Sequence, residues 1–278
     1  MDYSEVFANL PNMTLSGVVS LFFLILMRIV PIMALAPFLG SKLAPGIAKM
    51  GLAICLSVIF LPILAVKLDK PVVFNNAFIL YSLKEILIGF VLGFLIAIPF
   101  YMVQTSGTIV DYLRGASIMQ SQDPSLQTQA SPIGILYNYI LIVIFFQISG
   151  PFLFFDAIVK SYDVIPPTGG LNPIFFAVKS PFWNHSFDIM NQIVTIAIQL
   201  SAPALVAILM AEMFLGIANR LAPQVQIAFL GMSIKSLLGL GLLWAAWFFI
   251  LKQFTKHSFE WLDMINNMIS FMKLMNAS

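Results

Sequence analysis

Six long apolar runs are the feature that most limits what this chain can fold into. Each is long enough to cross the roughly 30 Å hydrocarbon core of a bilayer as a helix. The 278 residues are 60% hydrophobic and only 9% charged, so a water-soluble fold has too few polar residues to cover its surface. The sequence therefore predicts an all-α, polytopic membrane protein with about six hydrophobic helical segments. They are Leu15–Ala36, Ile47–Val66, Ala77–Val103, Pro132–Phe155, Ile189–Asn219 and Ile227–Leu251.

Prolines inside and between the runs indicate that several helices are kinked or broken. Pro31, Pro99 and Pro203 lie within the first, third and fifth runs, where each removes a backbone hydrogen bond and either kinks the helix or marks its end. A short segment around Pro223 joins the last two runs, which predicts a C-terminal helical hairpin. Residues 252–278 carry apolar residues at helical spacing, as expected for an amphipathic tail.

The distribution of Lys and Arg in the connections favours a cytoplasmic location for both termini. With the N-terminus inside, seven lysines fall on the inner side and four basic residues on the outer side. The inner group is Lys67, Lys70, Lys160, Lys179, Lys252, Lys256 and Lys273, and the outer group is Lys42, Lys49, Arg114 and Arg220.

A few ionisable residues lie at membrane depth, where an isolated charge costs roughly 2.5–3.5 kcal/mol. Each is therefore expected to face protein or water and to have a partner. One interpretation is a proton or ion pathway, or a polar subunit interface; the other is buried ion pairs that fix helix register, or side chains that reach an interface. Few acids lie in the runs, which argues against a proton-coupled transporter. The residues are Arg28, Lys84, Glu85, Glu212 and Lys235.

Two spacings in these runs predict specific contacts. Glu212 and Lys235 stand at comparable distances from Pro223 on opposite arms of the hairpin, so we expect them to pair. Gly89 and Gly93 form a small-residue face that lets another helix approach closely. Gly239 belongs to a similar face on the sixth run.

Several classes of function gain no support from the sequence. The chain has no hydrolase, phosphate-binding or dinucleotide motif, and its acids lack metal-ligand spacing, so neither an enzyme, a cofactor nor a metal site is expected. The single Cys55 allows no disulfide within the chain. The net charge is only +2 and the basic residues are scattered, which does not favour nucleic-acid binding.

A series of uncommon motifs, in order, resembles the FliR/SctT family, the T component of the type III secretion export apparatus. The resemblance extends from about Leu21 to Leu251, and the Leu215–Gln224 region is its most specific part. The loop with Asp111 and Arg114-Gly115-Ala116-Ser117 resembles the virulence injectisome branch more than the flagellar branch. The other motifs are Arg28-Ile29-Val30-Pro31, Lys84-Glu85-Ile86-Leu87-Ile88-Gly89, Ser131-Pro132-Ile133-Gly134, Ser161-Tyr162, Ala211-Glu212-Met213-Phe214-Leu215-Gly216 and Asn219-Arg220-Leu221-Ala222-Pro223-Gln224.

This resemblance implies a core subunit of a protein-export gate in the bacterial inner membrane. Its partners would be the R, S, U and V components, the lipid bilayer and unfolded protein substrates. The chain would form one membrane-embedded subunit over 1–278, with an R-like part at about 15–188 and an S-like hairpin at about 189–251. The family also implies that much of the complex can lie above the bilayer plane.

The resemblance assigns roles to individual residues as well. The polar stretch 105–121 would contribute to a plug in the closed pore, with Gly107 and Gly115 giving backbone freedom, Arg114 between them, and Ile118 and Met119 at the constriction. Taken without the family, the same stretch is an ordinary ordered connection. Buried polar or subunit-interface roles would fall to Arg28, Lys84, Glu85, Glu212, Arg220 and Lys235.

Two other functions are weighed against the export gate. A secondary solute or ion transporter would need its own water-lined site near the membrane midplane. A membrane-embedded enzyme would need a cluster of acids or histidines, and His185 and His257 both lie outside the runs.

Overall fold

The computed structural model describes residues 14–39, 44–67, 72–115, 131–169, 181–221, 227–257 and 261. Every regular element within these residues is a helix, which confirms the predicted all-α class. The elements are α2 (Leu15–Leu35), the short 3-10 helix η1 (Pro37–Leu39), α3 (Gly46–Ala65), α4 (Asn76–Leu113), α6 (Pro132–Gln147), α7 (Gly150–Val164), α8 (Pro181–Leu221), α9 (Ile227–Ala245) and a further helix at Trp247–His257.

The lengths of these helices agree with a polytopic membrane protein. In the described residues, four helices are long and apolar enough to cross a membrane: α2, α3, α4 and the part of α8 from Phe187 to Leu221. The number rises to six if each of two bent helix pairs counts as one span. These pairs are α6 with α7, and Ser233–Ala245 with Trp247–His257, the latter bent by 63°.

Two predicted runs are each broken into two helices. The fourth breaks between Gln147 and Gly150, where Ser149 adopts a left-handed conformation with φ 59°. The dipeptide Gly150-Pro151 that follows is a common sequence signal for such an interruption. The sixth run breaks after Ala245 without a proline or glycine beside the break.

The third run continues as helix well beyond the predicted end at Val103. The polar stretch from residue 104 was expected to be a connection, but α4 includes it as far as Leu113. Its hydroxyl groups are satisfied inside the helix: Thr105 donates to the Tyr101 carbonyl and Thr108 to the Gln104 carbonyl. Such bonds let Ser and Thr remain in a helix.

The helices fall into two compact units. The first contains Met1–Ala97, Gly150–Ser186 and Leu262–Ser278, and the second contains Ile98–Ser149 and Phe187–Trp261. The boundary in α4 falls just before Pro99, which lies inside that helix. Pro31 and Pro203 also lie inside their helices, so none of the three prolines predicted to kink or end a helix ends one.

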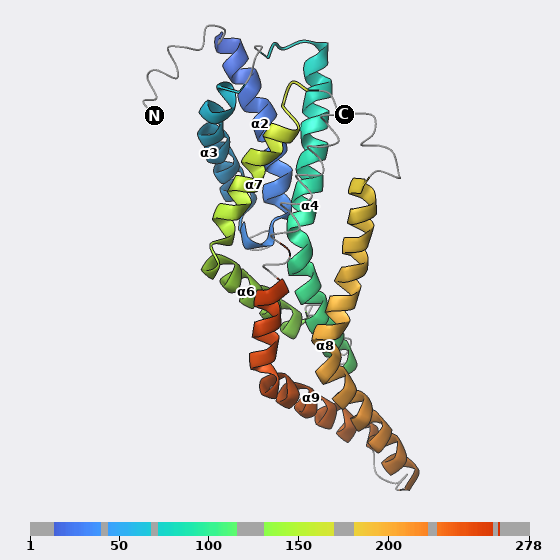
Figure 1. The fold of residues 1–278 in the computed structure, drawn as a ribbon. Helices are drawn as coiled ribbons and strands as arrows, with labels where there is room; N and C mark the ends of the chain where they lie inside the picture. The colour runs from blue at the N-terminus through green and yellow to red at the C-terminus, as the bar shows by residue number, and fades with distance from the viewer. Residues whose placement is uncertain are drawn as a thin grey trace. The chain divides into compact units, whose positions relative to one another are not determined.

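In the first unit, α2 is the central helix, with α3, α4 and α7 packed beside it (Figure 1). Its side chains at Leu24, Ile25, Ile29 and Ile32 are fully buried. The small-residue face of α4 makes the approach to α2 close. A Cβ on Gly93 would lie 3.0 Å from the Ile32 Cα, and one on Gly89 would clash with the backbone of Arg28, as the small-residue face predicted.

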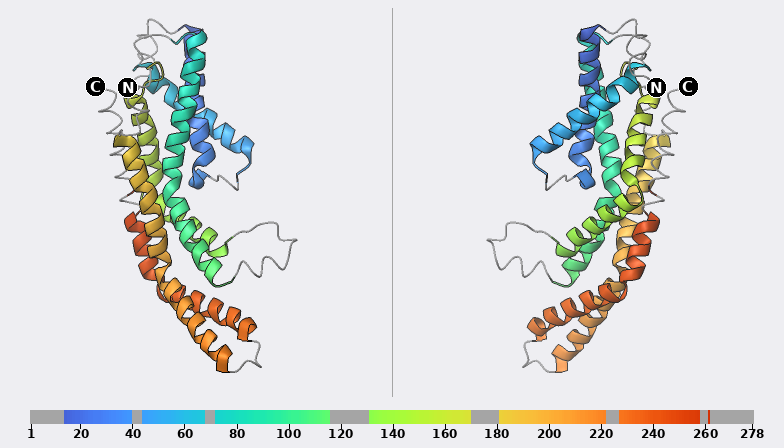
Figure 2. Two further views of the ribbon diagram at one scale, coloured as in Figure 1. Left: turned by 90° about the vertical axis from the view of Figure 1, so that its right-hand side faces the viewer. Right: turned by 90° about the vertical axis from the view of Figure 1, so that its left-hand side faces the viewer.

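In the second unit, the lower part of α4 packs on α6 at a pair of glycines. A Cβ on Gly107 would lie 2.6 Å from the Gly134 Cα, so neither position has room for a side chain. Phe100 of α4 packs edge-on against Phe145 of α6, with ring centroids 5.6 Å apart. The helices α8 and α9 lie side by side as the predicted hairpin (Figure 2).

Candidate functional site

A buried ion pair joins α2 to α4 in the first unit. The Arg28 guanidinium donates from Nε to Glu85 Oε2 at 2.5 Å and from Nη2 to Glu85 Oε1 at 2.9 Å. Both side chains are 0% exposed. Paired hydrogen bonds between planar groups give an ion pair strength and a fixed orientation. Arg28 and Glu85, two of the charges expected at membrane depth, are therefore partners of each other, and their contact lies within this chain.

Helix α7 completes the surroundings of Arg28. Its Nη1 donates to the Ser161 hydroxyl at 3.0 Å, and its Nη2 donates to the Ile165 carbonyl at 2.8 Å. The Tyr162 ring lies against the guanidinium, with Arg28 Cζ 3.8 Å from the ring centroid. One side chain of α2 thus fixes the positions of both α4 and α7.

Lys84 holds the turn that follows α7. Its ammonium donates to the carbonyls of Pro166, Pro167 and Gly169 at 2.7, 2.9 and 2.8 Å. It also lies 3.1 Å from Glu85 Oε1, so Glu85 is shared between two cations. Carbonyls beyond the end of a helix receive no hydrogen bond from it, and here the Lys84 ammonium donates to them.

Glu212 of α8 and Lys235 of α9 form an ion pair across the hairpin, as their spacing from Pro223 predicted. The Glu212 side chain is 48% exposed and that of Lys235 is 20% exposed. Two glycines of α9 face α8 in the same hairpin: Gly231 lies against Leu215 and Gly239 against Ile208. Arg220 is exposed in the last turn of α8, where the helix dipole favours a cation.

The residues predicted for the plug fall at the end of α4 and beyond it. Gly107 is helical and packed against Gly134, so it does not provide the backbone freedom expected of a loop glycine. Arg114 forms an ion pair with Asp111 at 2.6 Å, and Gly115 adopts φ 85°, which glycine tolerates best. Ile118 and Met119 lie outside the described residues.

Asp111 connects the end of α4 to the start of α6. Its Oδ2 accepts from the Ser131 hydroxyl at 2.5 Å and from the Ile133 backbone amide at 2.9 Å. The Ser131 hydroxyl in turn accepts from the Gly134 amide at 2.9 Å as the N-cap of α6. We call Asp111, Arg114 and Ser131 the α4–α6 clasp; it joins the chain on either side of residues 116–130.

The sequence named Asp111, Ser131 and Ser161-Tyr162 only as parts of the family motifs, and Arg114 as a plug residue as well. The contacts of Asp111 with Ser131 and of Ser161 with Arg28 join positions 20 and 133 residues apart, so they could be found only by knowing which helices are neighbours. In the described residues, no group of three or more His, Cys, Asp or Glu side chains is arranged to hold a metal.

Comparison with known proteins places the chain in a family. Residues 19–261 match the family model "Bacterial export proteins, family 1". The chain is 34% identical over 218 residues to "Yop proteins translocation protein T" of Yersinia pestis, covering 77% of this chain and 80% of that protein. It is 31% identical over 154 residues to "Secretion system apparatus protein SsaT" of Salmonella typhimurium, covering 55% and 58%.

A flagellar relative is also present. "Flagellar biosynthetic protein FliR" of Escherichia coli is 26% identical over 257 residues, covering 92% of this chain and 95% of that protein. The higher identity to the Yersinia protein favours the injectisome branch, as the loop at Asp111 indicated. The match over nearly the whole chain, together with its helices of membrane-spanning length, identifies the protein as a member of the bacterial export proteins, family 1.

Proposed function

We propose that this chain is a core, non-enzymatic subunit of a type III secretion export gate. It forms part of the wall of an inner-membrane passage for unfolded protein substrates. The family match over residues 19–261 carries the proposal. The names of the Yersinia and Salmonella relatives, which refer to translocation and to a secretion system, support it.

The buried charges support a structural role better than a transport site within the chain. Arg28 and Lys84 both contact Glu85, and other donors of each cation bond to a hydroxyl or to backbone carbonyls of the same unit. A solute or ion transporter needs polar groups at membrane depth that can exchange partners with a solute. In this chain Arg28, Lys84 and Glu85 instead form the contacts that join α2, α4 and α7.

We propose further that the partners are the R, S, U and V components and the translocated substrates. The excess of Lys on one side of the membrane supports a cytoplasmic location for both termini. Residues 15–188 correspond to the R-like part and 189–251 to the S-like hairpin. Arg220, exposed in the last turn of α8, and the Glu212–Lys235 pair are candidates for subunit contacts.

Residues 105–121 supply part of the plug in this proposal. The helical end of α4 and the α4–α6 clasp support this role, because they hold the two ends of the plug segment in place: Asp111 contacts Arg114 before residues 116–130 and Ser131 and Ile133 after them. The constriction itself would come from Ile118 and Met119, as apolar side chains that exclude water and ions.

The test is gentle detergent extraction of the tagged chain from its native host, followed by mass measurement and identification of the co-purifying proteins. We expect a large hetero-complex that contains other export components. Deletion of the gene should abolish secretion, and the plasmid-borne gene should restore it. A stable monomer or homodimer that moves a solute by itself would overturn the proposal in favour of a transporter.

The plug has a separate test. Deletion of residues 118–121 should leave the complex assembled but make the membrane permeable to small ions. Unchanged conductance in a fully assembled complex would count against the plug without affecting the family assignment.

A further inference from the structure

Between Asp156 and Asp163, the exposed residues of α7 are charged and stand in a register that places them on one side of the helix. Asp156, Lys160 and Asp163 are spaced by four and three residues. Asp156 pairs with Lys160 at 2.7 Å, and their side chains are 53% and 51% exposed. Asp163 pairs with Lys67, just beyond the end of α3. We call the three α7 residues, together with Lys67 from the end of α3, the charged face of α7.

The opposite side of α7 fixes this orientation. Ile158, Ser161 and Tyr162 are buried in the first unit. Ser161 accepts a hydrogen bond from Arg28, and the Tyr162 ring lies against the same guanidinium. A rotation that turned the charges inward would break both contacts and leave Arg28 with unsatisfied donors. The charged face therefore remains on the outside of the unit.

Lipid tails are a poor neighbour for this face. Together, α6 and α7 have the length and hydropathy of a broken membrane span, bent by 77°, and a charge costs roughly 2.5–3.5 kcal/mol at the centre of a span. Asp156 lies eight residues before the end of α7 at Val164, which is about 12 Å at 1.5 Å per residue. A long lysine can reach toward water from such a depth, but a short carboxylate cannot.

The exposed faces of α3 and α4 in the same unit are apolar, in contrast to the charged face of α7. The outward residues of α3 include Val58 and Ile59, exposed by 57% and 58%. Those of α4 include Leu80 and Leu83, exposed by 68% and 64%. These apolar surfaces suit lipid or an apolar protein partner, so the first unit has two chemically distinct outer faces.

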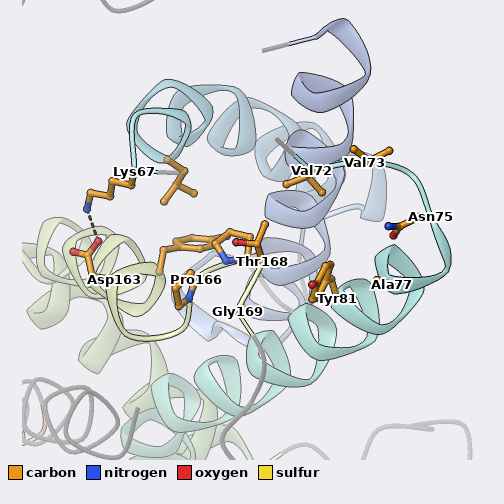
Figure 3. Close-up of a pocket in the computed structure, with 13 residues that line it drawn as sticks. Lys67, Val72, Val73, Asn75, Ala77, Tyr81, Asp163, Pro166, Thr168 and Gly169 are labelled. Carbon is orange, nitrogen blue, oxygen red and sulfur yellow. Dashed lines mark hydrogen bonds and ion pairs between the residues drawn. The ribbon is translucent and has the colours of Figure 1, made fainter. Parts of the chain in front are cut away.

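The charged face leads into a pocket at the end of α7. The pocket has a volume of about 650 Å³ and lies between the end of α3, the start of α4 and the turn after α7. The Lys67–Asp163 pair stands on one side of it, with Asn75 and Tyr81 on the other and Thr168 from the turn between them (Figure 3). Its lining mixes polar and apolar groups.

We propose that the charged face of α7 and this pocket border the aqueous route of the exported polypeptide. The proposal rests on the proposed function, which makes the chain a wall of that route. The face carries two cations and two anions paired with one another, so it is hydrated without a strong preference for segments of one charge. Such a surface fits an unfolded substrate whose side chains vary along its length.

The test measures the accessibility of single cysteines in the assembled complex. Cys55 is the only native cysteine and is exposed, so a Cys55→Ala background is needed. Lys160→Cys and Asp156→Cys probe the charged face, Val58→Cys the apolar face of α3, and Ile158→Cys the buried side of α7. The purified complex, in lipid nanodiscs, is treated with a charged thiol reagent that does not enter membranes.

We expect Lys160→Cys and Asp156→Cys to react at least about tenfold faster than Val58→Cys and Ile158→Cys, since the reactive thiolate forms in water. A substrate arrested in the passage should slow both probes several-fold. Failure to react, equally fast reaction of Val58→Cys, or reaction unchanged by the arrested substrate would each overturn the proposal. Secretion and complex formation in the Cys55→Ala parent report separately on the proposed function.

Discussion

The Arg28 guanidinium and the Glu85 carboxylate meet through two hydrogen bonds, at 2.5 and 2.9 Å, although 57 positions separate them in the chain. Both are fully buried, and Ser161 and the Ile165 carbonyl occupy further donors of Arg28. Helices α2 and α4 are thus held in one register by an ion pair as well as by packing.

Removing one partner of this pair should destabilise the protein strongly. Glu85→Ala leaves Arg28 and Lys84 as buried cations without a counter-charge, and such a loss typically costs about 3–5 kcal/mol. We expect reduced abundance in the membrane and a lower thermal midpoint of the purified chain. Asp156→Asn is the matched control, because it removes a half-exposed pair that is worth about 0–1 kcal/mol. Equal effects of the two substitutions would contradict the structural role of Glu85.

The close approach of α2 and α4 makes Gly89 sensitive to a single methyl group. In Gly89→Ala the new Cβ would meet the Arg28 backbone, and such overpacking typically costs about 1–3 kcal/mol. Gly51→Ala in α3 is the control, since no atom lies within 4 Å of its Cβ position. There the better helix propensity of Ala should leave stability unchanged or slightly raised. Thermal unfolding of the two variants in the same detergent compares them; indistinguishable midpoints would argue against the packed interface.

Charge reversal tests the hairpin pair. Lys235→Glu places two anions beside each other, and an unpaired charge at membrane depth costs roughly 2.5–3.5 kcal/mol. We expect a several-fold loss of assembled complex in this variant and in Glu212→Lys, measured by native electrophoresis. The double variant restores opposite charges and should recover most of the assembly. If the double variant behaves as the sum of the two single ones, the pair does not stabilise the hairpin.

Asp111 is the residue of the α4–α6 clasp whose loss should matter most. Asp111→Ala removes the acceptor for the Ser131 hydroxyl and the Ile133 amide and leaves Arg114 without its ion pair. Leaving such groups unsatisfied typically costs about 1–3 kcal/mol. We expect a lower thermal midpoint and increased ion leakage through the assembled complex.

Ser131→Ala provides a graded comparison for the clasp. It removes the hydrogen bond to Asp111 and the N-cap bond from the Gly134 amide, but it keeps the Ile133 and Arg114 contacts of Asp111. Its effect on ion leakage should therefore be smaller than that of Asp111→Ala. An assembled Asp111→Ala complex with normal stability and conductance would show that the clasp is not needed to close the passage.

The sequence predicted those features that depend on local spacing. The comparable distances of Glu212 and Lys235 from Pro223 predicted their pairing, and the four-residue spacing of Gly89 and Gly93 predicted a close helix contact. Both predictions need only the geometry of one helix or one hairpin. The apolar runs similarly located the helices, because membrane thickness sets their length.

The features that depend on tertiary neighbours could not be predicted. Arg28 was expected to have a partner, but the choice of Glu85 and Ser161 follows from the packing of α2, α4 and α7. The helical continuation of α4 to Leu113 was missed for a related reason. Its polar residues are typical of a loop in isolation, whereas here Gln104 accepts a hydrogen bond from Asn138 of α6 and Asp111 accepts one from the Ile133 amide in the first turn of that helix.

The Arg28 contacts have a consequence for biogenesis. Arg28 is synthesised before Glu85 by 57 residues and before Ser161 by 133 residues. At a synthesis rate of about 5–20 residues per second, α2 waits roughly 3–11 s for its counter-charge and longer for α7. During that interval an uncompensated guanidinium occupies a nascent membrane helix. Retention of α2 beside the insertion machinery until α4 emerges would shelter that charge, so the order of synthesis sets the order in which the first unit can assemble.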